Sequence, residues 1–179
     1  MLKIVIIVLG AILIAIGVVL ILAAFKPDTF RVQRSTLIYA SPEKVYPLIA
    51  DFRQWTAWSP YERKDPAMKR TYSGAPSGVG AMYAWDGNKE IGAGSMEIVQ
   101  ANAPANVGLK LDFSRPFEAH NNVVFSLTPQ ADGTVVTWDM QGPSPFIGKI
   151  MHVFFNMDRM VGSDFEVGLA NLKAEAEKK

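Results

Sequence analysis

Residues 133–142, Gly-Thr-Val-Val-Thr-Trp-Asp-Met-Gln-Gly, are the stretch that decides the fold. Val136, Trp138 and Met140 alternate with polar side chains, and alternation with period two is typical of a strand that buries one face. The pair Asp132-Gly133 at its start is a strong hairpin signal. This strand is therefore expected to pair antiparallel with the strand before it.

Immediately after this strand, the period of the apolar side chains changes. From residue 146 to residue 172 they recur at steps of three and four, which predicts an amphipathic helix. The pattern fits one long helix, or two helices broken near Asn156 or Gly162. Residues 173–179 are rich in charge and are expected to form a solvated end.

Six further stretches between turn residues show strand-like patterns. They are residues 30–39, 69–73, 80–85, 95–100, 107–113 and 120–128. Two short helices are expected after the first of them, one beginning at Ser41 and Pro42 and one in the aromatic segment around Trp55. Only the final helix is long enough to cover the apolar face of the sheet. The sequence therefore predicts an α+β fold, a curved antiparallel sheet of about seven strands wrapped around the C-terminal helix.

The N-terminal segment has a different character. Residues 4–25 contain no charged side chain, and a helix of this length spans about 33 Å, enough to cross a hydrocarbon core of about 30 Å. A core helix would show a polar stripe, and a signal peptide has a shorter apolar region. We therefore expect one uncleaved transmembrane helix, with residues 1–26 as the anchor of a single-pass protein of the bacterial inner membrane.

The charges beside this segment leave the side of the membrane open. Lys26, Arg31 and Arg34 favour a cytoplasmic domain, whereas the very short N-terminal tail is equally typical of a signal anchor with its N-terminus inside. The spacing Ala11-x-x-x-Ala15 would allow helix packing but arises easily in such a segment, so the oligomeric state also stays open.

Composition excludes several classes of function. The chain has 18 basic and 17 acidic residues, so it has no basic excess with which to neutralise phosphates, and nucleic-acid binding is not expected. It contains no cysteine, which excludes disulfides and thiol chemistry. No histidine or carboxylate spacing is typical of metal ligands, and neither a metal nor a cofactor is predicted.

Several short motifs occur in an order that resembles one known superfamily. They are Ala40-Ser41-Pro42-Glu43-Lys44-Val45-Tyr46, Trp55-x-x-Trp58-Ser59-Pro60, Tyr72-Ser73-Gly74, Gly92-x-Gly94-x-Met96, Gly133-Thr134-x-Val136-x-Trp138 and Gly168-Leu169-x-x-Leu172-Lys173. Over roughly residues 30–175 the chain resembles START-like helix-grip proteins of the SRPBCC superfamily, specifically polyketide cyclase/dehydrase-like proteins with an N-terminal membrane anchor. The resemblance implies that residues 27–179 form a ligand-binding domain, but it implies no particular reaction or ligand. Tyr61 stands where the family pattern often has Trp.

A sheet wrapped around one helix leaves a gap at its open end, and an apolar gap can hold a ligand. Strand parity and helical spacing place a set of apolar side chains around it, with Trp55, Trp58 and Tyr61 at the opening. The candidate ligand-binding residues are Trp55, Trp58, Tyr61, Met96, Leu109, Leu111, Phe113, Val136, Trp138, Met140, Phe154, Met157 and Val161. The alternative for this set is that it fills an ordinary core.

Catalytic signals are weak. The chain has two histidines and no Gly-x-Ser-x-Gly elbow. His120 and Arg115 are the weak catalytic candidates, and they require strand pairing that turns His120 into the cavity. We therefore expect a membrane-anchored domain that binds a hydrophobic small molecule or lipid. The alternatives are a cyclase/dehydrase-type enzyme, and a membrane-localised protein-interaction domain that presents Trp55, Trp58 and Tyr61 on its surface.

Overall fold

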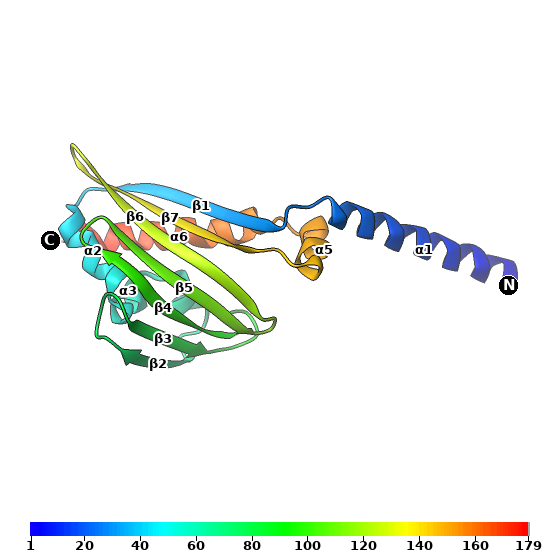
Figure 1. The fold of residues 1–179 in the computed structure, drawn as a ribbon, viewed down its shortest axis with the longest axis horizontal. Coiled ribbons are helices and arrows are strands. Elements are labelled where there is room, and N and C mark those ends of the chain that lie inside the picture. The colour runs from blue at the N-terminus through cyan, green and yellow to red at the C-terminus, as the bar shows by residue number, and fades with distance from the viewer. Residues whose placement is uncertain (179) are drawn as a thin grey trace.

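One antiparallel sheet of seven strands forms most of the domain in the computed structural model, which describes residues 1–178 (Figure 1). Its strands, in chain order, are β1 (Thr29–Ile38), β2 (Lys69–Gly74), β3 (Ala81–Asp86), β4 (Ala93–Asn102), β5 (Asn106–Arg115), β6 (Ala119–Gln130) and β7 (Gly133–Pro143). They lie side by side in the order β1-β7-β6-β5-β4-β3-β2. Each strand matches a predicted stretch to within about two residues at either end, so the predicted sheet is confirmed.

The helices lie before, beside and across this sheet. They are α1 (Leu2–Ala24), α2 (Pro42–Ala50), the 3-10 turn η1 (Phe52–Gln54), α3 (Trp55–Trp58), α4 (Pro60–Lys64), α5 (Phe146–Phe154) and α6 (Met157–Ala176). Helix α6 runs along the concave face of the sheet and buries Phe165, Leu169 and Leu172 there (Figure 1). The predicted α+β helix-grip architecture is therefore confirmed.

The C-terminal helical segment forms two helices, α5 and α6, with a break at Phe155 and Asn156, which is one of the two predicted alternatives. Phe155 has an extended backbone, and Asn156 begins α6 by accepting a hydrogen bond at its side-chain oxygen from the backbone N of Arg159, at 2.9 Å. Because of this break, α5 leaves the sheet, and of the two C-terminal helices only α6 runs along it. Phe154, at the end of α5, is 63% exposed, so its expected position facing the sheet is wrong.

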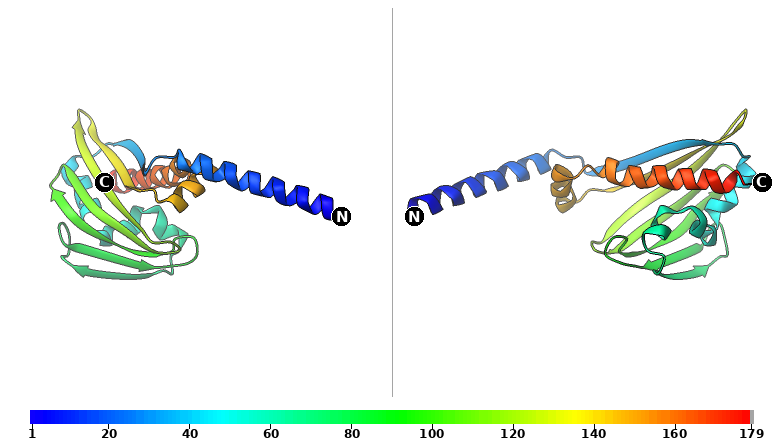
Figure 2. Two further views of the ribbon diagram at one scale, coloured as in Figure 1. Left: turned by 45° about the vertical axis from the view of Figure 1, so that its right-hand side comes forward. Right: turned by 180° about the vertical axis from the view of Figure 1, so that it is seen from behind.

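Helix α1 stands away from the domain, and Figure 2 shows it projecting from one end. Its segment Lys3–Ala24 has a mean hydropathy of 3.5 and is long and apolar enough to cross a membrane, properties that an N-terminal signal sequence shares. Helix α1 contacts α5 at its base. The linker is fixed there by Asp28, whose backbone O accepts from Ser144 N at 2.7 Å and whose Oδ1 accepts from Lys149 Nζ at 2.6 Å.

The strand register identifies which loops share the end of the sheet nearest α1. Asp86 pairs with Ala93, Ala93 pairs with Arg115, and Thr29 pairs with Pro143. The β3–β4 turn, the β5–β6 loop and the β7–α5 connection therefore all lie at this end, which we call the α1 end. The β2–β3 turn lies at the opposite end of the sheet (Figure 1).

Candidate functional site: an apolar cavity between sheet and helix

A cavity of about 450 Å³ lies between the inner face of the sheet and α6. Apolar and aromatic side chains from β3 to β7, α3 and α6 make up most of its wall. This volume is within the range of about 300–1,000 Å³ that is usual for small-molecule sites. The gap predicted at the open end of the sheet is therefore present.

Most of the predicted site residues lie on the wall of this cavity. Those that line it are Trp55, Tyr61, Met96, Leu109, Leu111, Phe113, Trp138, Met140, Met157 and Val161. The strand members share one face because successive side chains on a strand alternate between faces. Met157 and Val161 are four residues apart on α6 and therefore lie on one side of that helix.

Three predicted residues lie elsewhere. Val136 and Trp58 are fully buried in the core, outside the cavity wall, and Phe154 is the exposed residue at the end of α5.

Trp55 and Trp58 do not lie at an opening of the cavity, where they were expected. Their indole N–H groups donate to the carbonyls of Ile49 and Leu48, at 2.9 and 2.8 Å. These carbonyls belong to the last turn of α2 and need partners from outside the helix, which explains why both rings turn inward. The alternative of a protein-interaction domain required Trp55, Trp58 and Tyr61 on the surface, and the burial of Trp55 and Trp58 contradicts it.

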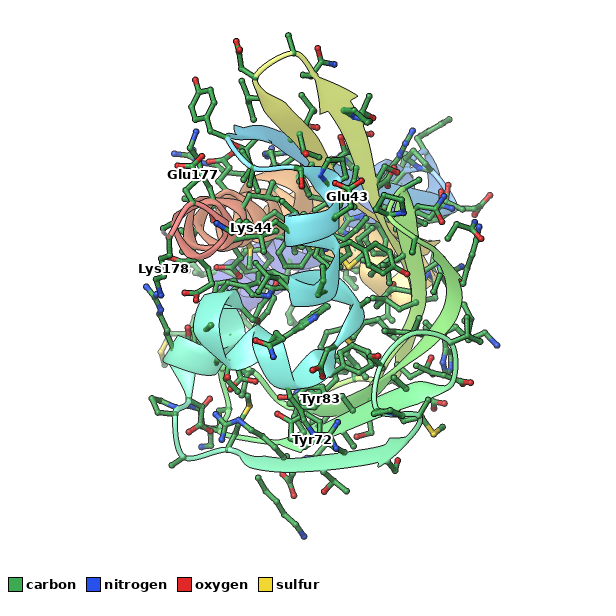
Figure 3. The ribbon with its side chains drawn as sticks, turned by 90° about the vertical axis from the view of Figure 1, so that its left-hand side faces the viewer. Glu43, Lys44, Tyr72, Tyr83, Glu177 and Lys178 are labelled. Carbon is green, nitrogen blue, oxygen red and sulfur yellow. The ribbon has the colours of Figure 1, made fainter. Side chains whose placement is uncertain are left out.

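Glu62 is the main polar residue of the wall, and it was not among the residues predicted from the sequence. Its side chain is only 6% exposed, its Oε2 accepts from Arg70 Nε at 2.7 Å, and its Oε1 accepts from the hydroxyl of Tyr83 at 2.9 Å. Both Glu62 and Tyr83 line the cavity. Burial, and then the nearby Glu62 charge, raises the pKa of Tyr83 above its ordinary value, so this hydroxyl is a donor at neutral pH. Tyr83 also lies beside Tyr72, on the neighbouring strand (Figure 3).

A second polar group lies on the wall where β7 leads into α5. Ser144 Oγ is 3.4 Å from His152 Nδ1, and both residues line the cavity together with Asn121. His152 also packs edge-on against Phe30, with ring centroids 6.3 Å apart. His152 falls within residues 146–172, for which the sequence predicts helix, but the sequence carries no signal that it borders the cavity.

His120, the predicted base, is on the other side of the sheet. It is opposite Asp112 in the β5–β6 register, while the neighbouring Leu111 and Asn121 line the cavity. His120 Nδ1 lies 2.7 Å from Asp112 Oδ1 in a shallow depression of the outer surface, and the side chain is 65% exposed. Arg115 pairs with Asp86 at the surface. The arrangement required for catalysis by His120 and Arg115 is therefore absent.

The hydrogen bond with Asp112, reinforced by Glu118, raises the pKa of His120 above its ordinary value of 6.5. This shift reflects a surface ion-pair cluster. No group of three or more His, Cys, Asp or Glu side chains among residues 1–178 is placed to hold a metal ion.

The fold and cavity define an α+β helix-grip protein with an apolar interior site. A family model described as "Polyketide cyclase / dehydrase and lipid transport" matches residues 29–177. The chain therefore belongs to this family, which is the class that its motifs resemble.

Solved structures show the same fold at low sequence identity. A protein from Chromobacterium violaceum is 14% identical, with a TM-score of 0.60 over 86% of this chain and 100% of that chain. The Aha1 dimer from Colwellia psychrerythraea is 17% identical, with a TM-score of 0.57 over 83% and 96%. The di-domain ARO/CYC protein BexL of the BE-7585A biosynthetic pathway is 12% identical, with a TM-score of 0.61 over 88% and 53%. No curated protein sequence matches the chain.

Proposed function

We propose that this protein is a membrane-anchored binding domain that holds one hydrophobic small molecule or lipid between its sheet and α6. The observation that carries the proposal is the largely apolar cavity of about 450 Å³. Its wall includes thioethers from Met68, Met96, Met140 and Met157, and flexible methionine side chains suit apolar ligands of varied shape.

The few polar groups of the wall would orient such a ligand. Glu62 keeps lone pairs beyond its bonds to Arg70 and Tyr83, so it can accept a hydrogen bond from a ligand hydroxyl or amine. Ser144 and His152 supply a second polar position. A ligand with a long apolar body and one or two polar groups fits this distribution best.

Anchoring by α1 is the second part of the proposal. Residues 4–24 are apolar around the whole helix, and apart from Ala23 at its base the span is not buried against the domain. A bilayer would satisfy this surface, and it would also supply the apolar molecules that the cavity accepts.

The test is whether one apolar molecule accompanies the purified full-length chain. Native mass spectrometry after gentle removal of detergent should show the protein with one bound small molecule. A filled variant, Leu111→Phe with Val161→Phe, adds volume at two positions on the cavity wall. It should carry the bound molecule several-fold less often than the wild type.

The matched control is a surface variant, Val99→Phe with Val167→Phe, which makes the same kind of change at exposed positions of β4 and α6. It should retain the molecule at the level of the wild type. An equal amount of bound molecule in the filled and surface variants would show that the ligand is not in the cavity.

A cyclase or dehydrase activity is the second candidate, and one observation favours it. Glu62 and Tyr83 present a carboxylate and a protonated hydroxyl on the cavity wall, which could move a proton on a bound carbonyl compound. Glu62→Gln tests this idea. An enzyme should accumulate unreacted substrate in the variant, so the extracted molecule should differ from that of the wild type. A pure binding domain should yield the same molecule from both.

A further inference from the structure

Helix α5 has an unusual distribution of apolar and polar side chains. Ile147, Met151 and Phe154 are 64%, 43% and 63% exposed, and their spacing of four and three residues puts them on one face. The polar side chains turn the other way: Lys149 is only 12% exposed in its pair with Asp28, and His152 borders the cavity. A helix on the surface of a soluble domain shows the opposite arrangement, with its polar face outward.

This apolar face adjoins the mouth of the cavity. Ile147 and Phe117 both line the cavity and are strongly exposed, at 64% and 71%, so they mark where it opens. Phe117 belongs to the β5–β6 loop, and Ile147 belongs to α5. This loop and this helix both lie at the α1 end of the sheet (Figure 1).

Just over half of the large apolar side chains that residues 27–178 leave exposed belong to the β5–β6 loop, α5, the connection from α5 to α6, and the start of α6. We call this group the apolar collar; its members are Phe117, Phe146, Ile147, Met151, Phe154, Phe155 and Met160. Monomeric soluble proteins rarely expose many neighbouring apolar side chains, and such a surface usually contacts a membrane or another protein.

The position of α1 decides between these two kinds of partner. Helix α1 contacts α5 and ends at Ala24, and Asp28 is hydrogen-bonded to both Ser144 and Lys149. Only residues 25–27 lie between these points, and extended chain spans at most about 3.6 Å per residue. Asp28 is therefore held within about 14 Å of the end of the apolar span. Its bonds to Ser144 and Lys149, and the contact between α1 and α5, keep α5 beside that end.

We infer that the apolar collar lies in the surface of the bilayer that α1 crosses, so that the mouth of the cavity opens directly onto lipid. The inference rests on the proposed anchor. An amphipathic helix that lies in the interface buries its apolar face at the boundary between headgroups and acyl chains. An apolar ligand would then enter from the membrane without crossing water.

The rim of the mouth also carries two acidic residues. Glu90 and Glu118 border the cavity and are exposed. They would remain at the level of the headgroups while Phe117 and α5 reach deeper. The collar therefore fits a bilayer surface in which neutral lipids are present.

Single-cysteine labelling of the full-length chain tests the inference, because the protein has no cysteine of its own. Phe117→Cys and Met151→Cys place a fluorescent NBD label on the collar. Val79→Cys places it on the exposed β2–β3 turn at the opposite end, and Ile12→Cys places it within α1. Each protein is reconstituted in liposomes of phosphatidylcholine and phosphatidylglycerol. Quenching is then measured with nitroxide-labelled lipid and with aqueous iodide.

The labels at residues 12, 117 and 151 should be quenched by nitroxide lipid and protected from iodide, and the label at residue 79 should show the reverse. If iodide quenches residues 117 and 151 as strongly as residue 79 while residue 12 is in lipid, the inference is wrong and the proposed anchor stands. If residue 12 is also in water, the anchor itself is wrong and the inference fails with it.

Ligand occupancy is measured separately on the same proteins by native mass spectrometry. A collar embedded in lipid together with an empty cavity would contradict the proposed ligand, but it would support the inferred membrane contact.

Uptake of cis-parinaric acid from donor vesicles provides the kinetic test of the entry route. Met151→Asp should slow uptake several-fold relative to Val79→Asp, with the same final occupancy, and equal rates would contradict entry through the collar.

Discussion

The indole of Trp138 on β7 lies flat against the ring of Phe165 on α6, with centroids 4.0 Å apart and an angle of 9° between the planes. Trp55 and Trp58 meet the same indole edge-on, with centroids 6.5 and 5.7 Å away. The indole Nε1 has no hydrogen-bond partner in the described part of the chain, so packing fixes this ring. This contact joins the sheet to the helix. It is also part of the wall of the site, because Trp138 and Phe165 both line the cavity.

Gly168 makes room for this contact, and Gly168→Ala should therefore destabilise the protein. An added Cβ would lie 2.7 Å from Trp138 Cζ3 and 3.0 Å from Pro60 Cδ. Overpacking of this kind costs about 1–3 kcal/mol. The gain in helix propensity is at most about 1 kcal/mol, so the clash should prevail. The measurement is the Tm of the full-length chain in detergent micelles, which should fall by about 2–4 °C for each kcal/mol lost.

Gly148→Ala in α5 provides the matched control. Its added Cβ would meet nothing closer than Pro145 Cδ and Ser144 Oγ, both at 3.6 Å, which is ordinary contact. Its Tm should therefore be unchanged or slightly raised. Equal Tm values for the two variants would show that the packing around Gly168 has room for an added methyl group.

Glu62→Gln should be more destabilising than Tyr83→Phe. Glu62→Gln leaves the partly buried Arg70 without its carboxylate partner, and it places a neutral amide next to two donors, Arg70 Nε and the Tyr83 hydroxyl. Tyr83→Phe removes only one hydrogen bond from Glu62. We expect losses in the free energy of unfolding of about 2–4 kcal/mol for Glu62→Gln and about 1–2 kcal/mol for Tyr83→Phe. Denaturant titration of the full-length chain measures both. The reverse order would mean that the Arg70 pair adds little to stability.

His120 should titrate above the ordinary pKa of a histidine. Asp112 and Glu118 raise the pKa of His120, so the folded state favours the protonated form of this histidine. The resulting stabilisation is fully present below the unfolded pKa near 6.5 and is lost as the pH rises through the higher folded pKa. NMR titration of the ring protons, with His120→Gln for assignment, should give a midpoint above 6.5. Asp112→Asn should lower that midpoint more than Glu118→Gln does, and a wild-type midpoint at or below 6.5 would contradict this account.

Local patterns were sufficient to predict the sheet and a set of apolar residues that line the cavity. On β5 and β7, strict alternation assigns Leu109, Leu111, Trp138 and Met140 to one face, and all four line the cavity. The failure at Phe154 has a definite cause. Helical spacing continues through residue 154, but the backbone becomes extended at Phe155, and α5 packs against the base of α1.

The polar part of the site could not be predicted because it depends on contacts between distant segments. Glu62 is one carboxylate in the charged run Glu62-Arg63-Lys64, which reads as a solvated turn. Its burial arises only when α4 packs over β2 and β3 and brings Arg70 and Tyr83 to its two oxygens. In the same way, the apolar surface of α5 indicates a membrane contact only because the structure places α1 beside it.

Energy transfer from tryptophan to cis-parinaric acid shows whether the cavity holds an apolar ligand. Three of the four tryptophans, Trp55, Trp85 and Trp138, line the cavity, so a ligand inside it lies close to the donors. In nanodiscs, the wild type and the surface variant should show saturable transfer at one molecule per chain, and the filled variant should show several-fold weaker binding. Identical, non-saturating transfer in all three proteins would mean that the probe only enters the lipid, and would contradict the proposed binding in the cavity.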